Sequence, residues 1–279
     1  EKELAILAPG GCPTERHLVQ AYRRKTLTKF QTEAEQHAFW AQLLKKTLPE
    51  VARWAANIPQ LEDAIRTALV KRGGLGYLPP TPQTFPPSEA FISWVLASDA
   101  LPMIAWLDGT SAGESDPPAL FECLRAQGAL ALNIIPDRNH NIAQADQRAL
   151  QLKKLAAVID LAERLQMPIN IGTEMNKAGQ PFADDIGCEA LRPYQHIFLR
   201  GARILVGQSI LARYAGFAYA GRAARAEFGT DLRRQNDFFE GVGGLPPLTK
   251  PRADHLTSLN PTQAFSLLQD SVRRQAWAV

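Results

Sequence analysis

The chain has 279 residues, of which 46% are hydrophobic, and its 31 Lys and Arg against 28 Asp and Glu leave a formal net charge of +3. A chain of this size buries a substantial core as one large or two modest domains, and the near balance of charge gives little support to nucleic-acid binding. No apolar run reaches the length of about 18 residues that marks a membrane span, and the start shows no signal-peptide pattern.

The cysteines indicate a reducing compartment. Cys12, Cys123 and Cys188 are far apart, odd in number and without CxxC spacing. A disulfide framework and a structural zinc site are therefore not expected, and a cytoplasmic location fits best.

The first 72 residues are predicted to form a mainly helical segment packed on the rest of the chain. Lys2–Ala8 has the composition of a short strand, and apolar residues then recur at helical spacing up to about residue 71. Thr32 has the character of a helix N-cap, while Pro49 and Pro59 divide this region into separate helices.

From residue 73 onward the sequence alternates between strands and helices. Strands are predicted to begin near residues 101, 129, 168 and 202, the last of them over 202–206. The predicted helices cover roughly 88–96, 117–127, 144–166, 189–200 and 222–228, and a last helix follows Asn260. This alternation predicts parallel strands joined by right-handed crossovers.

The predicted fold class is α/β, with a (β/α) TIM-like barrel over residues 73–279 that includes C-terminal helices. The glycine fingerprint of dinucleotide-binding folds is absent, which favours a barrel over an open doubly wound sheet. Only five strands are evident when one entered through the glycine-rich stretch Gly73–Leu78 is included, with Lys2–Ala8 as a sixth, so we expect a distorted or incomplete barrel.

Three predicted strands end in polar residues. Met103–Leu107 is followed by Asp108-Gly109-Thr110-Ser111, Ala131–Ile135 by Pro136-Asp137-Arg138-Asn139-His140, and Ile169–Ile171 by Gly172-Thr173-Glu174-Met175-Asn176. Chemistry in barrels gathers at the C-terminal ends of several strands. We therefore expect the functional site at this edge.

Each of these residues also has an ordinary structural explanation. Asp is a common turn and N-cap residue, Glu174 is able to cap a helix or to pair with Lys177, and Arg138 is able to pair with a neighbouring acid. The acidic pair Asp184-Asp185 is interpreted as solvated surface. The predicted catalytic residues are Asp108, Asp137, Glu174 and His140, and the predicted substrate-binding residues are Arg138, Asn139, Asn176, Lys177 and Gln208.

The three polar stretches, within roughly residues 73 to 228, resemble metal-dependent hydrolases of the amidohydrolase and polymerase-and-histidinol-phosphatase type. The resemblance implies a distorted barrel that holds divalent metal and activates water against an ester, amide or phosphoester. Asp137 and Glu174 match the metal ligands best, and Zn, Mn and Mg are not distinguished. The His-x-His pair of such enzymes is missing, and Gly207-Gln208-Ser209 stands where a histidine is expected. Either a histidine-bearing strand precedes Glu1 or the metal site has decayed.

Three functions follow as hypotheses. The first is a metal-dependent hydrolase of a small anionic substrate, with Arg138 as the anion-binding group. The second is a carbohydrate-active barrel, either a sugar isomerase or a glycosidase that uses two carboxylates. The third is a non-catalytic barrel that binds a ligand at the same edge, and a homo-oligomer is compatible with each.

Overall fold

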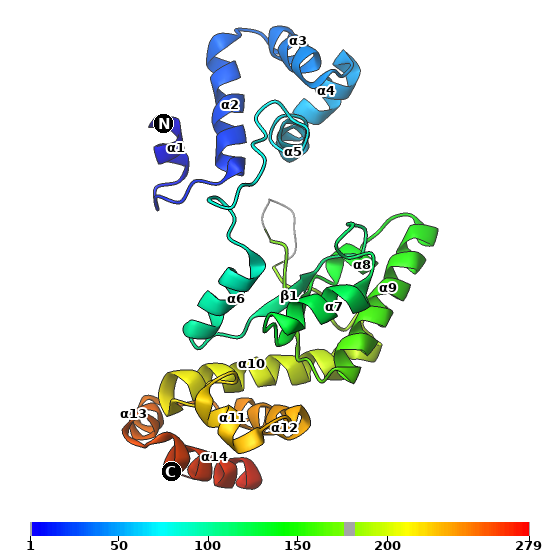
Figure 1. Ribbon diagram of the computed structural model, residues 1–279. Coiled ribbons are helices and arrows are strands. Elements are labelled where there is room, and N and C mark those ends of the chain that lie inside the picture. Colours follow the sequence, from blue (N-terminus) through cyan, green and yellow to red (C-terminus); the bar gives the residue numbers. More distant parts are fainter. Residues whose placement is uncertain (1, 176–181, 279) are drawn as a thin grey trace. The chain divides into compact units, whose positions relative to one another are not determined.

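The computed structural model describes residues 2–175 and 182–278, and all structural statements concern these residues. The chain divides into two compact units, with the boundary between Phe85 and Pro86. Figure 1 shows the first unit as helices only and the second as a small sheet with helices. No described helix is both long and apolar enough to cross a membrane.

The first unit contains five helices within the described residues: α1 (Lys2–Leu7), α2 (Glu15–Lys29), α3 (Glu33–Leu44), α4 (Leu48–Ala55) and α5 (Ile58–Leu69). The N-cap prediction at Thr32 is confirmed, because its hydroxyl accepts from the backbone N–H of Glu35 at 3.3 Å. Pro49 and Pro59 occupy the first turns of α4 and α5, where a missing N–H costs nothing. Apolar side chains from α2 to α5 form one core: Val19, Trp40, Leu44, Val51, Leu61 and Ile65.

The strand predicted at Lys2–Ala8 is wrong, since α1 occupies Lys2–Leu7. Lys, Glu, Leu and Ala are strong helix formers, and Glu3 lies in the first turn, where a negative charge favours the helix dipole. Helix propensity therefore outweighs the short apolar run.

The second unit contains a three-stranded parallel sheet in the order β1 (Met103–Trp106), β2 (Ala131–Ile134), β3 (Ile169–Ile171). Between the strands lie α7 (Pro117–Ala126), the short α8 (Asp137–His140) and α9 (Ala145–Arg164), and α6 (Ser88–Ala97) precedes them. These three strands and the helices near residues 88–96, 117–127 and 144–166 confirm the predicted elements.

The predicted TIM-like barrel is wrong. The sheet within the described residues has three strands, and β1 and β3 are its edges, whereas a barrel must close on itself. A short helix, Arg192–Tyr194 (η1), and α10 (Gln195–Ala215) follow β3, and from there the described chain is helical. The architecture is a small parallel sheet inside a mainly helical protein.

The two faces of the sheet differ in chemistry. The register places Ile104, Leu132 and Ile169 side by side, and these side chains join the core formed with α7 and α9. On the opposite face Ala105, Asn133 and Asn170 are in register, and the Asn170 amide donates to Asn133 Oδ1 at 2.6 Å. Ala105 is exposed, so this face is open at β1.

Residues 202–206, predicted as a strand, lie inside α10. The buried positions of α10 recur every three or four residues, including Phe198, Ile204 and Leu211, which is the period of a helix. A five-residue apolar run does not distinguish a strand from a buried helix segment, and the longer period decides.

The remaining helices are α11 (Arg222–Phe228), α12 (Leu232–Gly243), α13 (Lys250–Ser258) and α14 (Pro261–Arg274). Asn260 caps α14 by accepting from Gln263 N at 3.0 Å, which confirms the predicted last helix. These helices and α10 share an aromatic core in which Phe217 stacks on Phe265 with ring centroids 5.2 Å apart.

Candidate functional site

The loop after β1 is organised by Glu114, which the sequence analysis missed. Its carboxylate accepts from Leu107 N at 2.6 Å, from Gly109 N at 3.3 Å and from Ser111 Oγ at 3.2 Å. Gly109 has a φ of 69°, which L side chains rarely adopt. The signal in the sequence is an acid six residues after Asp108, in a stretch rich in Gly and Ser.

Asp108 lies in this loop, and both of its carboxylate oxygens accept hydrogen bonds. Thr110 donates to Oδ1 through its hydroxyl and its backbone N–H, and Arg138 donates to Oδ2 through Nε and Nη2 at 3.3 Å each. Burial alone would raise the pKa of the Asp108 carboxyl, but the bonds from Thr110 and Arg138 outweigh it and hold that pKa below its ordinary value.

A pH dependence of stability follows from the lowered pKa of Asp108. A carboxyl whose pKa is lower in the folded protein than in the unfolded chain stabilises the fold above the unfolded pKa and loses this contribution as pH falls through the folded pKa. We therefore expect the free energy of unfolding of Asp108→Asn to lie furthest below that of the unmodified chain at pH 7 and to converge towards it below the ordinary pKa of 3.8. Urea unfolding at a series of pH values measures this, and a difference that grows on acidification would contradict it.

Arg138 joins the ends of all three strands. It lies on α8 after β2, reaches Asp108 after β1, and donates from Nη1 to both oxygens of Glu174 after β3, at 3.1 and 2.9 Å. The side chains of Arg138 and Glu174 are 36% and 34% exposed, and that of Asp108 is 14% exposed. The guanidinium is thus paired with two carboxylates that remain reachable from solvent.

Asn139 holds α8 against the end of β1. It is fully buried, and its Nδ2 donates to Leu107 O at 2.9 Å and to Ile135 O at 3.1 Å. Its Oδ1 has no hydrogen-bond partner among the described residues, although a buried amide oxygen normally has one.

Asp184 belongs to the same region, contrary to its interpretation as solvated surface. Its Oδ2 accepts from Asp137 N at 3.3 Å, while Oδ1 and His140 Nε2 are buried without a partner among the described residues. Burial is the main reason that the pKa of Asp184 is raised; the charge of Asp137 adds to it, and the bond from Asp137 N and the nearby His140 oppose it. Asp185 is exposed and accepts from Gly187 N.

The structure therefore places six of the predicted site residues at one edge of the sheet: Asp108, Asp137, Arg138, Asn139, His140 and Glu174. Gln208 does not belong there. It is buried in α10, donates to Asp99 O and accepts from Tyr219 N, each at 2.6 Å, so it has a structural role. Asn176 and Lys177 lie outside the described residues.

The described residues do not form the metal site that the sequence predicted. Across residues 2–175 and 182–278, no group of three or more His, Cys, Asp or Glu side chains is placed to hold a metal ion. Of the two predicted ligands, Glu174 is bonded to the cation of Arg138, and Asp137 Oδ1 accepts from Asn141. The positive charge at this edge is supplied by the protein itself.

Comparisons of the chain with models of protein families, with curated proteins and with solved structures found no match. The site is therefore interpreted from its own geometry and charge.

Proposed function

We propose that the C-terminal edge of the sheet binds a small molecule through a protonated amine. The observation that carries the proposal is the pairing of Arg138 with both Asp108 and Glu174. A guanidinium that already donates to two carboxylates has little left to offer an anion. The anionic substrate expected from the sequence is therefore replaced by a cationic one.

The balance of charge at the edge supports a cation. The carboxylates of Asp108, Glu114, Asp137, Glu174 and Asp184 lie here, against the side-chain cations of Arg138 and Lys154, whose Nζ donates to Gly109 O at 3.0 Å. Such an excess of one sign attracts a ligand of the opposite sign.

The hydrogen-bonding capacity of the edge supports the same ligand. A carboxylate oxygen has two lone pairs, and each oxygen of Glu174 accepts one bond from Arg138. A protonated amine offers three N–H donors and no acceptor, so it complements this arrangement, whereas a carboxylate or phosphate would meet other acceptors.

Three four-carbon compounds that differ in charge test whether the edge prefers a cationic, an uncharged or an anionic ligand. Isothermal titration calorimetry with 1,4-diaminobutane, 1,4-butanediol and succinate on the full chain is expected to show binding of the diamine only. Glu174→Gln and Asp108→Asn keep the side-chain size and each remove one charge, and each is expected to weaken diamine binding by about tenfold because a charge-assisted bond is lost.

Glu122→Gln is the matched control, because Glu122 is an exposed residue of α7 and its loss should leave the affinity unchanged. Thermal melts verify that each variant is folded. Binding of succinate, equal binding of the uncharged diol, or diamine binding that neither edge variant weakens would overturn the proposal.

A further inference from the structure

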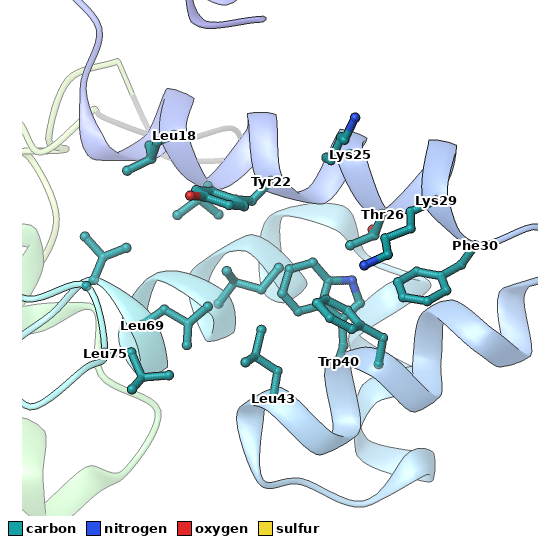
Figure 2. A pocket seen from close by; sticks show the side chains of 15 residues that line it. Leu18, Tyr22, Lys25, Thr26, Lys29, Phe30, Trp40, Leu43, Leu69 and Leu75 are labelled. Atoms are coloured by element: carbon teal, nitrogen blue, oxygen red, sulfur yellow. The ribbon is translucent and has the colours of Figure 1, made fainter. Parts of the chain in front are cut away.

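The first unit contains a hollow of about 520 Å³, and all of its lining residues lie between Leu18 and Gly76. It lies against α2, α3 and α5 and the residues that follow α5, and Figure 2 shows it from close by. Its apolar lining includes Val19, Phe39, Trp40, Leu43, Ile65 and Leu69. Sites for small organic ligands have this size and this predominance of apolar side chains.

The charged side chains that line the hollow are positive. Lys25 and Lys29, one turn apart on α2, are exposed, and neither forms an ion pair with any residue that the structure describes. Their neighbours Arg23 and Arg24 are paired with Glu62 and Glu3. No Asp or Glu is among the described residues that line the hollow.

The two lysines differ in direction. Figure 2 shows the Lys29 side chain turned back toward the rings of Phe30 and Trp40, whereas Lys25 points away from them. The Lys29 ammonium lies 5.7 Å from the centre of the Phe30 ring. A cation thus lies beside the aromatic part of the lining, and a second is available one turn away.

We propose that this hollow binds an amphiphilic anion, a molecule with an apolar chain or ring system and one carboxylate. The apolar body lies against Trp40 and Leu43. The carboxylate pairs with Lys29, and also with Lys25 once the Lys25 side chain rotates toward the hollow. Burial of the apolar body gives the affinity, and the lysines select a negative head group. This inference is independent of the amine site at the sheet edge.

Calorimetry on the full chain with monomeric decanoate, decanol and decyltrimethylammonium tests the sign of the head group. Decanoate is expected to bind about tenfold more tightly than decanol, and decyltrimethylammonium more weakly still. Octanoate is expected to bind about tenfold more weakly than decanoate, because two fewer methylenes are buried.

Variants of the lining test whether decanoate binds in the hollow. The double variant Lys25→Gln, Lys29→Gln is expected to weaken decanoate about tenfold, with Lys71→Gln, an exposed lysine outside the lining, as the control. Leu75→Glu adds a negative charge to the lining at a side chain that is 86% exposed, so it should weaken decanoate without loss of the fold.

The proposal is overturned if decanoate does not bind, if decyltrimethylammonium binds as tightly, or if both the double lysine variant and Leu75→Glu keep the affinity of the unmodified chain. Because the sheet-edge variant Glu174→Gln should leave decanoate binding unchanged, a loss there would also contradict the assignment to the hollow.

Discussion

Replacing Gly201 by alanine is expected to lower the free energy of unfolding by about 3 kcal/mol or to prevent folding. A Cβ at this position in α10 would lie 1.9 Å from the carbonyl oxygen of Ile169 in β3, and backbone on both sides leaves little room to move. Alanine in a helix interior is otherwise better than glycine by about 1 kcal/mol, so the sign of the change separates close packing from helix propensity.

Urea unfolding measures this effect, and Gly113→Ala is the matched control, because a Cβ there meets nothing within 4 Å. Gly113→Ala is expected to change the unfolding free energy by no more than about 0.5 kcal/mol. A Gly201→Ala variant that is as stable as the unmodified chain would show that α10 does not pack directly on β3.

Replacing Glu114 by alanine is expected to cost about 2–4 kcal/mol and to weaken diamine binding at the sheet edge. Glu114 is 9% exposed, and without it the N–H groups of Leu107 and Gly109 lose their acceptor. The loop that holds Asp108 would then lose its fixed conformation, so stability and affinity should fall together.

Glu114→Gln keeps one acceptor oxygen and should lie between the unmodified chain and the alanine variant in urea unfolding. Glu122→Ala is the control, because Glu122 is an exposed residue of α7 that does not hold the loop after β1. Equal stability of the Glu114→Ala and Glu122→Ala variants would show that the loop after β1 does not depend on its carboxylate.

The sequence predicts local structure well where short-range signals are strong. Thr32 with Glu35, Pro117 at the start of α7 and Asn260 before α14 are capping signals that act within one turn, and each marks a helix that the structure contains. The three strands were found because each is an apolar segment followed directly by turn-forming or polar residues.

The barrel prediction failed because it extended a local pattern to the whole chain. The third of its intervals between strand starts depended on residues 202–206, which belong to α10, where Gly201 and Gly207 allow close approach to β3 and α12. Such tertiary packing has no short-range signal. The number of strands and the closure of a sheet are therefore not determined by the spacing of apolar runs.

The location of the site was predicted better than its chemistry. The polar ends of the three strands predict Asp108, Arg138 and Glu174 at one edge of the sheet, and in the structure ion pairs join them. From the sequence, Glu174 and Asp137 were predicted as metal ligands, Asp108 as a catalytic residue and Arg138 as a free anion-binding group. Which charges neutralise each other depends on side-chain directions at the ends of different strands: Arg138 is 30 residues from Asp108 and 36 residues from Glu174 in the chain.

A crystal structure of the full chain grown with 1,4-diaminobutane tests the central claim most directly. We predict an amine nitrogen about 3 Å from carboxylate oxygens of Glu174 or Asp108, with Arg138 still bonded to both acids. An edge in which Arg138 has left these acids to bind an anion, or in which Glu174 and Asp137 coordinate a metal ion, would contradict the proposal.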